Sequence, residues 1–431
     1  MLFRAVPILL LLLAAPGWVL CAVAQQDINQ APIFYDSAPV TDAVAQLQQR
    51  LDSGQARLEW HEQHGWLPSL LELLEVPRSS QTLVFSKTSL QITKISPERP
   101  RALYFNDNVY LGTVQHGDLI EVSAVDPKLG AVFYSLAQRR SDHPRLVRDD
   151  ARCLSCHHTL RTNNVPGYLL RSVFTQESGE PRFDLGGATT DPTSDFADRY
   201  GGWYVTGTHG AMRHRGNTTV AAEGPAKSRN QHAANLTDLS DRFDTNRYLT
   251  PHSDLVALMV LEHQAHMHNA ITRAAYEARQ ADHYDKTWNK ILDKPARHQS
   301  DVSKRRIADA GEDLLAALLF SGEHRLTSPI AGASGFSKEF QAIGPRDPLG
   351  RSLRQLDLQT RIFKHPCSYL IYSESFESLP AVMRRYLDRR LKEILTGKDA
   401  TEAFAHLSAA DRKAIREILA DTLPEYESLR P

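Results

Sequence analysis

One pentapeptide constrains this 431-residue chain more than any other feature of its sequence. Residues 153–157 read Cys-Leu-Ser-Cys-His. On one turn of an α-helix, positions i, i+3 and i+4 share a face, so the side chains of Cys153, Cys156 and His157 would point the same way. Two thiols and an imidazole at this spacing are typical of covalent haem attachment. We therefore predict that both sulfurs bond one haem c and that His157 ligates its iron.

Two other uses of a C-x-x-C pair remain open on the residues alone. A zinc site needs a second Cys/His pair at short spacing, and Cys367 stands apart from any such pair. A redox disulfide does not need a histidine directly after its second cysteine. Chance explains the pentapeptide poorly, because 4 Cys and 18 His in 431 residues would give roughly 0.002 such sequences. Cys367 itself is interpreted as a small buried apolar side chain.

The first 24 residues have the layout of a secretory signal peptide. Arg4 precedes an apolar core over residues 5–15, and Ala22-Val23-Ala24 supplies small residues before the expected cleavage site. We therefore predict export to the periplasm, with no stable membrane span after cleavage. An uncleaved anchor is the alternative, although the apolar core is shorter than the roughly 20 residues that a spanning helix needs. Export agrees with haem attachment, because c-type haem is attached outside the cytoplasm.

Charge and cysteine content exclude two broad classes of protein. The chain has 50 Lys+Arg against 51 Asp+Glu, a formal net charge of −1. Nucleic-acid binding is not expected, because phosphate contacts need an excess of basic residues. The 4 Cys residues are too few for a disulfide-stapled scaffold.

The hydrophobic pattern predicts a mainly α protein with a small antiparallel β unit, an α+β fold. Short β-branched and aromatic runs between Thr82 and Ala137 read as strands. Helical patterns cover residues 39–75 and the chain from Pro251 to about Arg279, with Thr250 as the expected cap. Further helices are expected at Ser303–Phe320, Pro380–Leu395 and Ala409–Leu423, the last capped by Ser408. We divide the mature chain into an N-terminal helical and β region, a haem-binding region and a C-terminal helical region, covering residues 25–140, 141–250 and 251–431.

The residues that follow the pentapeptide resemble the cytochrome c proteins. Residues 163–169 read Asn-Asn-Val-Pro-Gly-Tyr-Leu. In cytochromes c, a Pro-Gly turn at this place offers a carbonyl to the second nitrogen of the axial histidine, and a following Leu packs on the porphyrin. The resemblance implies a cytochrome c-like segment within a larger helical protein, in which Pro166 orients His157 and Leu169 touches the ring.

The mature chain as a whole resembles a group of large bacterial exported monohaem c-type proteins. The segments that carry this resemblance are FNDNVYLG (105–112), GGWYVTGTHG with HRGN (201–217), LEHQAHMHN (261–269) and PCSYLIYS (366–373). No reaction is established for that group, so the resemblance implies a haem c protein and nothing finer.

The second axial ligand of the iron would decide between a carrier and an enzyme. His209 is our candidate for this metal ligand, since it lies between Gly207 and Gly210, which let backbone approach a bulky group closely. Three alternatives are Met212, His214 and His263, the last on the apolar stripe of a predicted helix. A haem with no second ligand from the chain also remains open. Arg213 and Arg215 are candidate partners for the haem propionates.

The sequence thus predicts a periplasmic c-type cytochrome that carries one covalent haem and acts in electron transfer. Its partner would be a redox protein or a small-molecule electron donor or acceptor. The alternative is a haem-dependent oxidoreductase, of peroxidase or oxidase type, acting on a small molecule. The first function predicts a haem with two strong axial ligands, and the second predicts an open or weakly held far side.

Overall fold

The computed structural model describes residues 27–224, 233–399 and 401–430. The predicted signal peptide at residues 1–24 lies outside this part of the chain.

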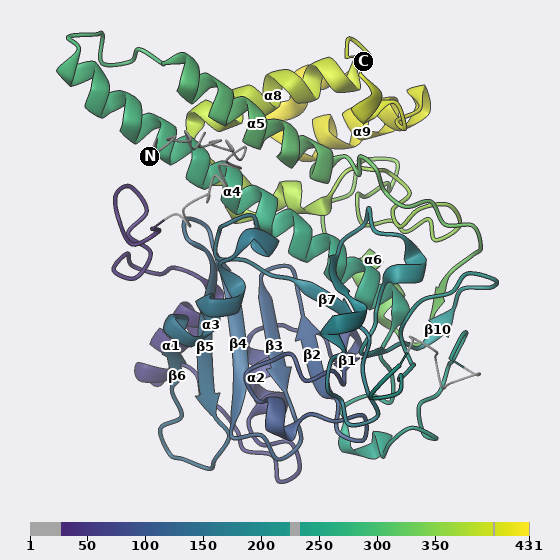
Figure 1. The fold of residues 1–431 in the computed structure, drawn as a ribbon. Helices are drawn as coiled ribbons and strands as arrows, with labels where there is room; N and C mark the ends of the chain where they lie inside the picture. Colours follow the sequence, from purple (N-terminus) through teal and green to yellow (C-terminus); the bar gives the residue numbers. More distant parts are fainter. Residues whose placement is uncertain (1–26, 225–232, 400, 431) are drawn as a thin grey trace, which may run out of the picture.

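A large antiparallel sheet forms the framework of the protein (Figure 1). Within the described residues it contains seven strands in the order β6-β5-β4-β3-β2-β1-β9. Hairpins join most neighbours, and the last strand reaches the edge beside β1 from more than a hundred residues further along the chain. The strands are β1 (Thr82–Val84), β2 (Arg101–Phe105), β3 (Val109–Thr113), β4 (Leu119–Asp126), β5 (Gly130–Ala137), β6 (Leu146–Arg148) and β9 (Trp203–Tyr204).

Successive side chains of the sheet alternate between two buried faces, as the period of a β-strand requires. One face packs with the short helices α1 (Ala43–Asp52) and α2 (Leu67–Leu73) in a hydrophobic cluster that runs from Ile28 to Tyr276. The other face turns toward the helical layer and belongs to a second cluster, which runs from Val84 to Leu429. Both clusters combine residues from more than one of the three regions predicted from the sequence.

The helical layer is built on one long helix, α4 (Leu255–Ile291). Figure 1 shows α4 running diagonally between the sheet and the helices α5 (Asp301–Leu318), α8 (Ala381–Leu395) and α9 (Ala409–Thr422). The carboxylate of Asp254 caps α4 by accepting hydrogen bonds from the N–H groups of Val256 and Ala257, at 2.8 and 3.1 Å. This arrangement leaves α4 with a buried surface on both the sheet side and the α5 side.

Shorter elements complete the fold. They are α3 (Asp150–His157), α6 (Phe336–Ala342) and α7 (Glu374–Glu377), together with two small antiparallel pairs, β7 (Leu170–Val173) with β8 (Gly187–Thr190) and β10 (Gly207–Thr208) with β11 (Ala331–Gly332). Among the described helices, none combines the length and the apolar character that crossing a membrane requires.

The predicted fold class, mainly α with a small β unit, is wrong. The sheet is a principal layer of the protein and not an appendage of a helical bundle, because one of its faces holds α1 and α2 while the other supports α4. The haem-binding segment was likewise expected inside a larger helical protein, and the structure instead places α3 against strand β5 of this sheet. Thr250 does not cap the helix that follows it, since α4 begins four residues later than expected, after Asp254.

Candidate functional site

Helix α3 brings the three side chains of the pentapeptide to one cavity. The predicted helical turn is confirmed, because α3 ends at His157. Cys153, Cys156 and His157 all line a cavity of about 500 Å³. A volume of this size lies in the range typical of small-molecule and cofactor sites. Cys153 is partly exposed and Cys156 is exposed, so both sulfurs are accessible for reaction.

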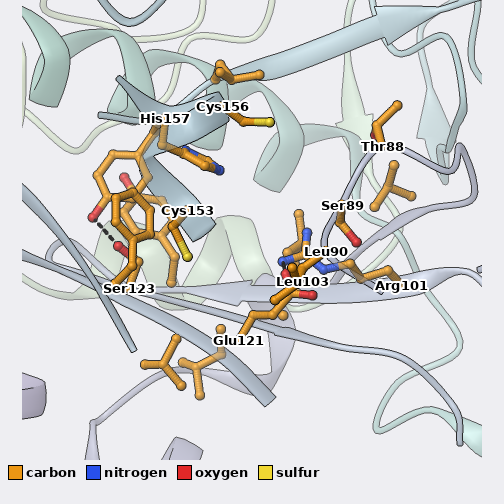
Figure 2. A pocket seen from close by; sticks show the side chains of 18 of the residues that line it. Thr88, Ser89, Leu90, Arg101, Leu103, Glu121, Ser123, Cys153, Cys156 and His157 are labelled. Carbon is orange, nitrogen blue, oxygen red and sulfur yellow. Dashed lines mark hydrogen bonds and ion pairs between the residues drawn. The ribbon is translucent and has the colours of Figure 1, made fainter. Parts of the chain in front are cut away.

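The walls of the cavity come from five parts of the fold. The sheet face that turns toward α4 forms one wall, and α3 forms another. The remaining walls are formed by the segments 88–90 and 168–171 and by Leu261 and Ala265 of α4. Figure 2 shows His157 and the two cysteines on one side of this cavity, with residues 88–90 and Arg101 on the opposite side.

One hydrogen bond fixes the proton of the His157 ring. Nδ1 of His157 lies 2.8 Å from the carbonyl oxygen of Gly167. Because a carbonyl oxygen only accepts, Nδ1 must carry the hydrogen, and the lone pair of the neutral ring is then on Nε2. The backbone N–H of Gly167 returns a bond of 2.9 Å to the carbonyl of His157. Burial lowers the pKa of His157, which favours this neutral form, with its lone pair available to a metal.

Asn269 of α4 holds the segment that accepts this bond. Its side-chain oxygen accepts from the N–H of Tyr168 at 2.8 Å, and its side-chain nitrogen donates to the carbonyl of Tyr168 at 2.7 Å. Gly167 makes room for this clamp, since a Cβ at that position would overlap Oδ1 of Asn269. The long helix therefore positions the carbonyl that orients His157.

The cytochrome c resemblance implied that the Pro166-Gly167 turn offers a backbone carbonyl to His157, with Pro166 orienting the ring. The carbonyl of Gly167, one residue later, accepts the hydrogen bond from His157. The carbonyl of Pro166 instead accepts from the N–H of Ala131 on β5, at 3.2 Å, which ties the turn to the sheet. Leu169 lines the cavity, as its expected contact with a bound ring requires.

The structure does not bring His209 to the cavity. Its Nδ1 donates to the carbonyl of Met212 at 2.9 Å, and its Nε2 accepts from the N–H of Asn235 at 3.1 Å. Both ring nitrogens are thus hydrogen-bonded within the chain, so the structure places His209, the predicted metal ligand, away from the cavity. Met212 is also directed elsewhere, because its sulfur accepts from the N–H of Thr327 at 3.4 Å.

The remaining candidates for a second axial ligand lie in other parts of the protein. Nδ1 of His214 accepts from the N–H of Gly216 at 3.0 Å. Nε2 of His263 lies 2.7 Å from the hydroxyl of Ser368, and its ring stacks on Phe320 at 4.3 Å. Neither histidine lines the cavity. His263 is completely buried in α4, and the ring of His214 contacts those of Phe196, Tyr200 and His209.

The arginines predicted to pair with haem propionates lie away from the cavity. Two other arginines, which the sequence analysis did not single out, line it. Arg213 donates to backbone carbonyls and Arg215 pairs with Asp198, so neither reaches the cavity. Arg161 and Arg171 line it instead. Burial, and secondly the charge of Arg161, lowers the pKa of Arg171.

Cys367 is remote from the pentapeptide. It is completely buried in the cluster around α4, and burial raises the pKa of its thiol. A buried thiol of this kind packs as a small apolar side chain, which is the interpretation made from the sequence.

Comparisons with known proteins give this chain no relative. No protein-family model, no curated protein and no solved structure matches it. In the part of the chain that the structure describes, no three side chains of His, Cys, Asp or Glu gather as a metal-ion cluster.

The Asn269 clamp predicts a large stability effect. Asn269→Ala leaves the N–H and the carbonyl of Tyr168 buried without partners, so the free energy of unfolding should fall by about 3 kcal/mol. Asn289→Ala is the matched control, since Asn289 is a buried Asn of the same helix with one bond to a loop carbonyl, at 2.7 Å. Urea unfolding measures both, and a smaller loss for Asn269→Ala than for Asn289→Ala would contradict the clamp.

The buried histidines predict that acid destabilises the protein. Burial lowers the pKa of His214 to about 3 and that of His268 to about 4, so both stay neutral in the folded state. The unfolded chain protonates them below a pKa of about 6.5, and stability is therefore full above that pH and falls as the pH drops. Between pH 7 and pH 5, His214→Asn should remove about 2 kcal/mol of this fall in urea unfolding. An unchanged pH dependence would refute this assignment.

Proposed function

We propose that this chain is an exported c-type haem protein that binds one haem covalently. Cys153 and Cys156 would bond the haem, and His157 would ligate its iron through Nε2. The observation that carries the proposal is that these three side chains line one cavity while Gly167 holds the His157 proton on Nδ1. A thiol pair next to an oriented, neutral imidazole is the donor set that covalent haem needs.

The other groups of the cavity fit the same cofactor. When bound, haem supplies one-electron redox chemistry. Apolar side chains, among them Leu103, Leu169 and Phe133, offer a surface for a flat ring and exclude water from it. Arg161 and Arg171 offer guanidinium groups for the two carboxylates that haem carries, since arginine is the preferred partner of a carboxylate.

Redox function follows from the proposed cofactor, either as electron transfer with a partner or as oxidoreduction of a small molecule. One observation favours the second candidate. Among the described residues that line the cavity, His157 is the only histidine, and there is no methionine or lysine. The three tyrosines there are hydrogen-bonded, Tyr110 to Gln264 at 2.8 Å, Tyr134 to Asp42 at 2.5 Å and Tyr168 to Ser123 at 3.0 Å. The far side of a haem at this site would therefore be open to a small ligand.

The attachment is tested by replacing the cysteines. In the exported wild-type protein, haem should stay with the polypeptide after extraction with acidified acetone. In the double variant Cys153→Ser, Cys156→Ser it should be extracted, because no thioether holds it. Cys367→Ser is the matched control and should retain haem like the wild type. Wild-type protein that loses all haem on extraction would refute covalent attachment.

The open far side is tested with carbon monoxide, which binds ferrous haem only where an axial position is free or weakly held. The reduced protein should bind the gas rapidly, with a shift in its visible spectrum. His209→Ala and His263→Ala should leave the spectrum of the protein without gas unchanged, because neither residue lines the cavity. A reduced protein that does not bind carbon monoxide would favour the electron-transfer function instead.

A further inference from the structure

A partly buried ion pair lies in the wall of the cavity and plays no part in attaching the cofactor. Arg101 of β2 donates through Nη2 to Oε2 of Glu121 on β4, and the two side chains are only 16% and 18% exposed. Both residues line the cavity. An ion pair that is partly withdrawn from water loses hydration energy, which offsets much of what the pair contributes to stability.

The sheet is adapted to hold this pair. Strand β3 runs between β2 and β4, and Gly112 of β3 pairs with Glu121 in the register of the sheet. A Cβ on Gly112 would overlap the guanidinium of Arg101, so only glycine lets that group lie across β3. Glycine inside a strand weakens it and often marks a place where another group approaches closely. Here the approaching group is the arginine that reaches Glu121.

The pair can still form hydrogen bonds to a molecule bound in the cavity. Oε1 of Glu121 accepts from Nε2 of Gln91 at 3.2 Å, which fixes the carboxylate while leaving lone pairs on its oxygens. Arg101 donates from Nη2 to Glu121, and its side chain lines the cavity and is 16% exposed, so its guanidinium can be reached from the cavity. The pair thus offers donors and acceptors side by side, with no net charge.

The pair lies across the cavity from the proposed iron ligand. Figure 2 shows Arg101 and Glu121 grouped near Ser89 and Leu90, away from His157 and the cysteines. A ligand on the open side of the haem would therefore meet this pair and not His157.

Building on the proposed function, we propose that Arg101 and Glu121 form the binding subsite for a small, neutral, protic molecule of the hydroperoxide class. Such a molecule carries an acceptor and a donor on neighbouring atoms. It would accept a hydrogen bond from Arg101 and donate one to Glu121. A neutral molecule suits a pair without net charge, because a charged molecule would lose its own hydration in the cavity and meet no net opposite charge there.

Hydrogen cyanide is a suitable probe, because it is small, neutral and protic and binds ferric haem with a change in the visible spectrum. The variants are Arg101→Leu, Glu121→Gln and Gly112→Ala, the last of which displaces Arg101 without removing it. Each should weaken cyanide binding roughly tenfold or more, the effect of losing a hydrogen bond to a charged group. Lys87→Met is the matched control, since Lys87 pairs with Glu180 beside the same segment but does not line the cavity.

Carbon monoxide supplies a second readout that does not depend on affinity. A guanidinium next to the bound gas should lower its C–O stretching frequency, so Arg101→Leu should raise that frequency and Lys87→Met should not. Haem content is measured first in every protein. Haem-loaded Arg101→Leu and Gly112→Ala with wild-type cyanide affinity and an unshifted C–O frequency would overturn the subsite and leave the proposed function standing. Wild-type protein without haem would overturn the proposed function, and this inference with it.

Discussion

The hydrogen bond from Nδ1 of His157 to the carbonyl of Gly167 is the interaction on which the site depends. It decides which nitrogen carries the proton, and so which nitrogen can bind a metal. The carbonyl belongs to the turn at 166–168. Asn269 of α4 hydrogen-bonds to this turn on one side, and Ala131 of the sheet hydrogen-bonds to it on the other. The two layers of the fold thus meet at this turn, and their packing fixes the direction of one imidazole.

The same two layers explain why a chain of this length surrounds one short motif. Helix α3 alone is eight residues long and could not fix its own side chains. The sheet supplies a wall with polar groups at Arg101 and Glu121, and α4 closes the cavity with Leu261 and Ala265. The walls from these two layers determine the shape of the cavity beside His157.

Local signals could be predicted from the sequence, and long-range pairings could not. The helical turn at the pentapeptide, the strand character of residues 82–137 and the cap at Ser408 are all present, because each depends on neighbours in the chain. The size of the sheet was missed, since strand β9 joins it from residues 203–204. The mainly α fold class was therefore wrong.

In the candidate site, too, the features set by neighbouring residues could be predicted and those set by long-range pairing could not. The cysteines and His157 share a helical face, which spacing alone determines. The choice of His209 rested on flanking glycines, and nothing local reveals that Asn235 and Met212 occupy both of its ring nitrogens. Arg101, Gly112 and Glu121 lie on separate strands, so their grouping appears only when the sheet register is known. Gly112, a glycine inside the strand run NVYLG, was the one available signal.

The most direct test of this account is the intact mass of the exported protein under denaturing conditions. The account predicts the mass of the mature polypeptide plus one haem, lost only when Cys153 and Cys156 are both replaced. A mass equal to that of the polypeptide alone, from cells that attach haem to other exported proteins, would contradict it.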